Sequence, residues 1–162
     1  QEVDRKTAMH QFLGVYNYIS SKSLTYLIPH EYHLQDQSFV ANLGLVMPHY
    51  NEGHTVVVSE FKSPPRVGEQ KPGLKFFHDM NFDVRVSPFH FEGEADLKYF
   101  NENNYIGAYG IRTSLDALNW FEKTFDMNIV KVENNNEQMY HLDYYYIAAK
   151  DFDNYFELPI FL

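Results

Sequence analysis

Three segments rich in aromatic and aliphatic residues begin at similar intervals along this 162-residue chain. They start at Phe39, Phe91 and Tyr140, which are 52 and 49 residues apart. Around each segment the pattern of apolar and turn residues predicts one helix and three strands. Self-similarity at a period of about 50 residues is typical of repeat architectures. We therefore expect a single α/β domain of three modules. Their approximate bounds are residues 6–61, 69–109 and 114–160.

The individual elements follow from apolar periodicity, from capping residues and from turn chemistry. The expected helices cover residues 6–21 and 73–80, and a third begins after Ser114, which is a good N-cap with Leu115, Leu118, Phe121 and Phe125 facing inward. The expected strands cover residues 24–28, 39–46, 55–58, 84–86, 91–100, 105–108, 128–132, 140–148 and 155–158.

The strand expected to start at Phe91 carries three carboxylates within five residues, Glu92, Glu94 and Asp96. In a regular strand these side chains would share one face, and a bulge at Gly93 would separate Glu92 from the other two. Like charges in a partly buried strand are costly unless they meet a cation, a metal or a cationic ligand. The alternative is an acidic strand end in solvent.

The strand expected to start at Tyr140 contains His141 and Asp143, which would face the same way. If the equivalent strands line a common axis, these residues would meet Asn42 and the acidic cluster there. Carboxylates can hold a planar guanidinium by paired charged hydrogen bonds, and a histidine oriented by a carboxylate can transfer protons near neutral pH. The alternatives are a core histidine at His141 and a turn or bulge residue at Asn42.

Composition excludes several classes of protein. A net charge of −9 and a pI near 5.2, with no basic cluster, argue against a nucleic-acid-binding protein. The chain has no cysteine, which excludes disulfides and a cysteine nucleophile within it. No apolar run is long enough to span a membrane, and we expect a soluble, cytoplasmic domain. The two histidines of residues 30–33 lack metal-site spacing, so we expect no metal. The sequence has no glycine-rich phosphate loop, and we expect no cofactor.

Five segments in order along the chain resemble the guanidino-group-modifying superfamily of arginine deiminases, dimethylargininases, arginine dihydrolases and amidinotransferases. Their sequences here are FVANLGLV from residue 39, PRVGE from 65, FEGEAD from 91, GIRTS from 110 and YHLD from 140. That family folds as a propeller of five modules. The resemblance therefore implies a partial pentein-type α/β-propeller of about three modules.

The resemblance also implies roles for the residues that match the family motifs. His141 is similar to the general acid/base, and Glu92 to the acid that pairs with that histidine or with the substrate guanidinium. Glu94 is an alternative to Glu92 because the motif is one residue longer here than the common Glu-x-x-Asp form. Asp143 and Asp96 are expected to bind the guanidinium group.

Further positions match motifs that bind the rest of the substrate. Asn42 stands where deiminases usually have Asp, which resembles the arginine dihydrolase branch. Arg66 and Arg112 resemble the pair that grips the substrate's carboxylate, and Asp36 resembles a nearby acid of the family motif. The alternatives are a plain surface arginine at Arg66 and a local ion pair of Arg112 with Asp116.

The chain departs from the family because the family's cysteine nucleophile, in the fifth module, is missing. We therefore expect part of a hydrolase or transferase that acts on the guanidino group of arginine or a methylarginine, without turnover by this chain alone. A non-catalytic guanidino-binding module and a structural assembly subunit are the alternatives. Exposed module edges would also favour a homo-oligomer.

Overall fold

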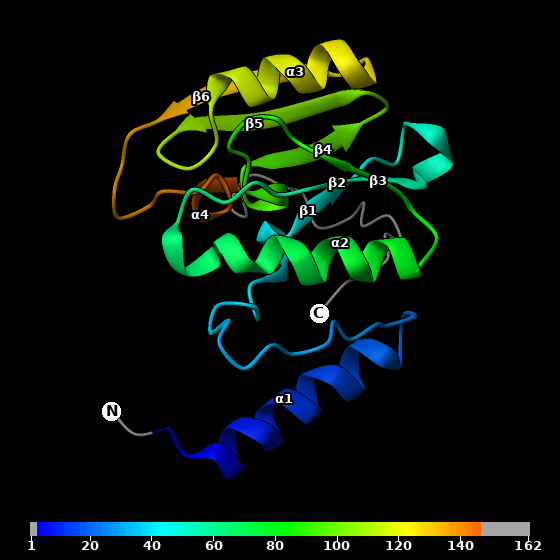
Figure 1. Ribbon diagram of the computed structural model, residues 1–162, viewed down its shortest axis with the longest axis vertical. Coiled ribbons are helices and arrows are strands. Elements are labelled where there is room, and N and C mark those ends of the chain that lie inside the picture. Colours follow the sequence, from blue (N-terminus) through cyan, green and yellow to red (C-terminus); the bar gives the residue numbers. More distant parts are fainter. Residues whose placement is uncertain (1–2, 147–162) are drawn as a thin grey trace. The chain divides into compact units, whose positions relative to one another are not determined.

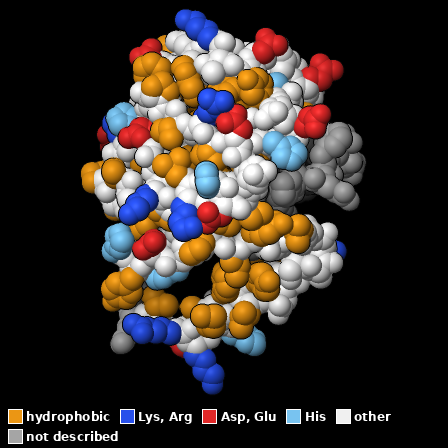
Figure 2. All heavy atoms as spheres, turned by 45° about the vertical axis from the view of Figure 1, so that its right-hand side comes forward, with side chains coloured by type: hydrophobic (Ala, Val, Ile, Leu, Met, Phe, Trp, Pro, Cys, Tyr) orange, Lys and Arg blue, Asp and Glu red, His pale blue; other side chains and the backbone are white. Residues whose placement is uncertain are grey.

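The computed structural model describes residues 3–146, and contacts divide the chain into two compact units (Figure 1). The first unit contains α1 (Arg5–Ser20), where Asp4 accepts hydrogen bonds from the backbone N–H groups of Lys6 and Thr7. This confirms the helix predicted over residues 6–21. No residue of α1 is buried, and apolar side chains cover much of its visible surface (Figure 2). The strand expected over residues 24–28 is wrong, since only Tyr26 forms an isolated bridge there.

The second unit begins with a three-stranded sheet of β1 (Gly44–Val46), β2 (Thr55–Val58) and β3 (Asp83–Val86). β1 is antiparallel to β2, and β2 is parallel to β3. Parallel neighbours need a long crossover, which here contains α2 (Gln70–Asp79). The helix begins three residues before the predicted start, and β2 has the predicted bounds. Every residue of β2 is buried, as a continuous apolar run in a central strand requires.

A second sheet repeats this order with β4 (Leu97–Asn101), β5 (Asn104–Gly110) and β6 (Asn128–Asn134). β4 and β5 form a hairpin, and α3 (Leu115–Phe125) connects β5 to its parallel neighbour β6. The side chain of Ser114 caps α3 by accepting from the N–H of Ala117, as predicted, although Leu115 is exposed. The structure is therefore a mixed α/β protein with two small sheets. The module bounds stay predictions.

One hydrophobic core joins the two sheets of the second unit. It includes residues of the first sheet and its flanks, such as Leu45 and Val57, and residues of the second sheet and of α3, such as Leu97 and Phe121. His49 adds a polar link, with one ring nitrogen 2.9 Å from the Tyr105 hydroxyl and the other 2.9 Å from the Phe125 carbonyl. The shared core fixes the first sheet against the second.

Two of the long strands predicted from sequence are wrong at their starts. The chain forms 3₁₀ turns at η1 (Val40–Asn42) and η4 (Gly93–Ala95) before β1 and β4 begin. Glu92, Glu94 and Asp96 therefore do not share a strand face. The cause is packing between the turns: Gly93 has φ +61°, and a Cβ there would lie 2.6 Å from the Ala41 carbonyl oxygen.

The strand predicted over residues 140–148 is also wrong in its described part. Residues 140–142 form no strand, and α4 (Asp143–Tyr146) is a short helix. Tertiary contacts override the strand propensity of the aromatic run. The backbone N–H of Leu142 donates to Asp96, and the Asn134 side chain donates to the Met139 carbonyl. The strand expected over residues 155–158 lies outside the described residues.

Replacing Gly93 with alanine tests the packing of the two turns. The added methyl group would meet backbone atoms of Ala41 and Asn42 at 2.6–2.8 Å, in a left-handed conformation that favours glycine. We expect a loss of about 2–4 kcal/mol in the free energy of unfolding, measured with urea. Gly14→Ala is the control, because a Cβ on Gly14 meets nothing within 4 Å. Equal stability of G93A and wild type would contradict the packing argument.

Candidate functional site

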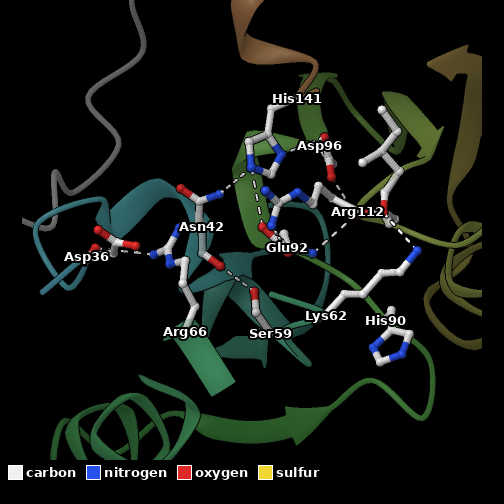
Figure 3. A network of polar contacts seen from close by, with 12 residues as sticks. Asp36, Asn42, Ser59, Lys62, Arg66, His90, Glu92, Asp96, Arg112 and His141 are labelled. Carbon is white, nitrogen blue, oxygen red and sulfur yellow. Dashed lines mark hydrogen bonds and ion pairs between the residues drawn. The ribbon is translucent and has the colours of Figure 1, made fainter. Parts of the chain in front are cut away.

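A cavity of about 460 Å³ opens where the turns η1 and η4 meet α4 and the loop before α3. It contains most of the residues that the sequence singled out (Figure 3). The lining residues are Asp36, Phe39, Asn42, Ser63, Arg66, Glu92, Arg112, Tyr140, His141, Asp143 and Tyr144.

Asp96 holds the imidazole of His141 through the Nδ1 atom of the ring. The Nδ1 atom of His141 lies 3.1 Å from Asp96 Oδ1, which also accepts a hydrogen bond from the backbone N–H of Leu142 at 3.2 Å. The hydroxyl of Thr113 donates to the other carboxylate oxygen of Asp96 at 2.7 Å. An acceptor at Nδ1 places a proton there, so Nε2 faces Asn42 and Glu92.

Glu92 is the least satisfied polar side chain of the site. It is fully buried, and neither carboxylate oxygen has a hydrogen-bond partner among the described residues. Its Oε2 lies 3.3 Å from His141 Nε2, and its Oε1 lies 3.5 Å from an Arg112 nitrogen. These contacts are ion pairs without hydrogen-bond alignment. The backbone N–H of Glu92 donates to the Thr113 hydroxyl, which holds the residue in place.

The charges of this cluster shift the pKa values of its members. Burial alone would lower the pKa of His141, but the contacts with Asp96 and Glu92 outweigh it and raise the pKa to about 9. Burial alone would raise the pKa of Glu92, but His141 and the charges of Arg112 and Arg66 lower it. Burial raises the pKa of Asp143. Near neutral pH the site therefore holds an imidazolium beside an ionised Glu92.

The amide of Asn42 responds to the charge of the imidazole. Its Nδ2 lies 3.0 Å from His141 Nε2, which suits a neutral ring that accepts a hydrogen bond. An imidazolium carries a proton on Nε2, so the amide must then turn its oxygen toward the ring. Asn42 is buried, and the Ser59 hydroxyl donates to its backbone carbonyl. The amide can therefore serve either protonation state without moving the backbone.

Arg66 is a buried residue of the cavity wall, so the interpretation as a plain surface arginine is wrong. It forms a bidentate pair with Glu69, with Nε–Oε1 at 2.9 Å and Nη2–Oε2 at 2.6 Å. Its Nη2 also donates to the Phe39 carbonyl at 3.1 Å, and the guanidinium lies over the Phe61 ring. Much of its hydrogen-bonding capacity is therefore used within the protein.

Arg112 lies closer to the centre of the site. Its guanidinium stacks over the Tyr140 ring at 4.4 Å from the centroid and pairs with Glu92. Among the residues that the structure describes it forms no ion pair with Asp116.

The other predicted residues divide into two groups. Asp36 and Asp143 line the cavity, and the Asp36 carbonyl accepts from Arg66 at 3.5 Å. Asp96 lies behind His141 with both oxygens bonded, and Glu94 is not among the cavity residues. The geometry thus favours Glu92 over Glu94 beside the histidine, and the roles of all these residues stay predictions.

Sequence reasoning missed the roles of Thr113, Glu69 and Tyr140. Glu69 could have been paired with Arg66 from its i, i+3 spacing in a helical turn. Thr113 adjoins Arg112 in a quoted motif, but its link between Asp96 and Glu92 depends on tertiary contacts. Tyr140 precedes His141, and nothing local indicates that an arginine stacks on its ring.

Neither a metal-binding cluster nor a membrane-spanning helix is present in the described residues, 3–146. These residues contain no cluster of three or more histidine or acidic side chains that could hold a metal ion. None of the helices described is long and apolar enough to cross a bilayer.

The raised pKa of His141 predicts a dependence of stability on pH. Because the folded protein binds this proton more tightly than the unfolded chain, the stabilisation is present below pH 6.5 and is lost as pH rises through about 9. We expect roughly 1–3 kcal/mol of unfolding free energy to be lost across this window. Urea unfolding at several pH values should show it in wild type and in the control His78→Gln, whose imidazole is exposed. A similar slope in His141→Gln would contradict the assignment.

The sequence has relatives among characterised enzymes, although no protein-family model matches it. Two bifunctional arginine dihydrolase/ornithine cyclodeaminases, AgrE of Nostoc sp. and ArgZ of Synechocystis sp., are each 30% identical to it over 142 residues. These residues make up 86% of this chain but only 20% and 19% of the two relatives. The chain therefore spans about a fifth of the length of these proteins.

Solved structures extend the comparison to the fold. Unliganded AgrE superimposes with a TM-score of 0.78 at 29% identity, over 86% of this chain and 20% of AgrE. The N-terminal domain of ArgZ, in a Cys-to-Ser variant bound to substrate, gives 0.77 at 29% identity, over 85% of this chain and 50% of that one. A dimethylarginine dimethylaminohydrolase shares the fold at 15% identity, with a TM-score of 0.69 over 86% of this chain and 55% of that one. The structural neighbours of this chain are therefore enzymes of the guanidino-modifying pentein superfamily, and the chain matches part of their domain.

Proposed function

We propose that the cavity binds the guanidinium group of arginine or a close relative. We further propose that the chain supplies the histidine and carboxylate half of an arginine dihydrolase-type site. The proposal takes its substrate class from the relatives, which are named as arginine dihydrolases. Its physical support comes from one observation, the buried and unbonded carboxylate of Glu92.

A buried carboxylate without hydrogen bonds is costly, and a ligand that supplies donors recovers that cost. A guanidinium is well matched, because it is planar, is always charged and presents N–H groups in pairs to a carboxylate. Asp143 adds a second carboxylate to the cavity, and Tyr140 adds an aromatic face on which a guanidinium can stack. An anionic ligand would bring no N–H donors of a cation to the carboxylate of Glu92, which has ion pairs but no hydrogen bonds within the described residues.

His141 is suited to proton transfer in such a site. Asp96 holds its Nδ1 side, so the proton on Nε2 lies on the side of Glu92 and Asn42. A protonated Nε2 can give its proton to a nitrogen that leaves the guanidinium carbon, and the neutral ring can then take a proton from attacking water. Asp96 and Thr113 keep the ring in the orientation that both steps need.

The covalent step needs a nucleophile that these residues do not supply. The sequence has no cysteine, the nucleophile of the family it resembles, and no other side chain of the site can simply replace it. We therefore expect that a nucleophile from outside these 162 residues would be needed for turnover. The same observation favours a second candidate function, guanidino binding without catalysis.

Three further properties of the protein remain predictions. They are the propeller arrangement of the modules, assembly into a homo-oligomer and a cytoplasmic location.

Calorimetric titration with L-arginine tests the proposed ligand. Wild type should bind arginine, and Glu92→Gln should weaken binding by about tenfold or more, because the charged acceptor for the guanidinium is lost. Glu137→Gln is the matched control, since Glu137 is exposed and is not among the cavity residues.

An assay for ammonia release from arginine separates the two candidate functions. The chain alone should release none above the blank, whereas turnover by it would contradict the need for an external nucleophile. Absence of arginine binding by wild type would overturn the proposed function.

A further inference from the structure

The guanidinium of Arg112 lies between an aromatic ring and a buried carboxylate. Its guanidinium lies 4.4 Å from the centroid of the Tyr140 ring and 3.5 Å from the carboxylate of Glu92. Figure 3 shows it pointing to the centre of the cluster, toward His141 and Glu92. Its side chain is 23% exposed, and it forms no hydrogen bond with the residues that the structure describes. The guanidinium is thus stacked and charge-paired, but it is not bonded in place.

Arg66 provides the contrast within the same cavity wall. Its guanidinium makes two aligned hydrogen bonds to Glu69 and a third to the Phe39 carbonyl, and its side chain is 8% exposed. Such bonding is typical of an arginine with a structural role. Arg112 lacks all of it, although Glu92 has two oxygens free of hydrogen bonds nearby.

The surroundings of the Arg112 head group are those that a ligand guanidinium would require. An aromatic face, an ionised carboxylate and a partly open cavity meet at this point. We propose that Arg112 competes with guanidino ligands for the guanidinium subsite of its own chain, and that a bound ligand displaces it. This inference rests on the proposed function and adds an internal competitor to it.

Displacement would also give the site a preference among guanidino compounds. The backbone beside Arg112 is held, because Lys62 donates to the Ile111 carbonyl and the Thr113 hydroxyl donates to Asp96. The long side chain can therefore swing while its Cα stays in place. Once displaced, Arg112 is free to pair with a carboxylate at the other end of the ligand. A guanidine without a carboxylate forms no such pair. The free energy needed to displace Arg112 therefore weakens its binding, and no new contact offsets that loss.

The test compares L-arginine with agmatine, its analogue without the carboxylate, in calorimetric titrations of wild type and Arg112→Met. Removing the internal competitor should strengthen agmatine binding by roughly 3–30-fold. In Arg112→Met, arginine no longer competes with the Arg112 side chain, but its carboxylate loses the cation with which it would pair. The ratio of arginine affinity to agmatine affinity should therefore fall. Arg85→Met, at an exposed arginine on β3, should leave both affinities unchanged.

A second measurement uses wild type alone, in case the variant does not fold. The Tyr140 ring should shift the side-chain NMR signals of Arg112 upfield, and saturating agmatine should remove that shift. Unchanged or weaker agmatine binding by folded Arg112→Met, or Arg112 signals that stay shifted in the complex, would overturn the inference while leaving the proposed function intact. Binding of neither compound by wild type and Arg112→Met would overturn the proposed function and this inference together.

Discussion

The close approach of two backbone turns at Gly93 determines where the site's side chains lie. Glycine has no Cβ, so η4 can lie against Ala41 and Asn42 of η1 at distances that a side chain would forbid. This contact sets Asn42 and Glu92 side by side, although they are fifty residues apart in the sequence. After the turns the chain continues as β1 in the first sheet and as β4 in the second sheet. The fold thereby delivers polar groups to the junction of two sheets that share an apolar core.

Of the two buried carboxylates at that junction, only one has its oxygens hydrogen-bonded within the described residues. Asp96 is fully bonded, by His141, by the Leu142 amide and by Thr113, so its burial costs little. Glu92 is equally buried but has ion pairs without hydrogen bonds. Two carboxylates on opposite sides of one imidazole thus have different environments. The bonded one orients the ring, and the unbonded one is available to a cationic group. A buried carboxylate without hydrogen bonds is expected at functional sites, where stability is given up for binding.

Sequence patterns predicted those elements whose signals are local. β2 is a continuous apolar run, and α3 follows a serine cap, so both could be located without tertiary information. The meeting of Asn42, Glu92 and His141 was predicted from repeated strand starts and from the family resemblance, and the structure does bring them together. The reason assumed for it was wrong, because these residues lie on turns and not on strand faces. The turns depend on the contact of Gly93 with Ala41, which local propensity cannot reveal. The stacking of Arg112 on Tyr140 is likewise a long-range contact.

We propose that Glu92 is an ionised, buried carboxylate that binds a guanidinium. The most direct measurement follows the side-chain carboxyl ¹³C signal of Glu92, assigned with Glu92→Gln, while L-arginine is titrated at neutral pH. We expect the chemical shift of a carboxylate in the free protein and a saturable change of that shift as arginine binds. The shift of a protonated acid in the free protein, or a signal that does not respond while arginine binds, would contradict it.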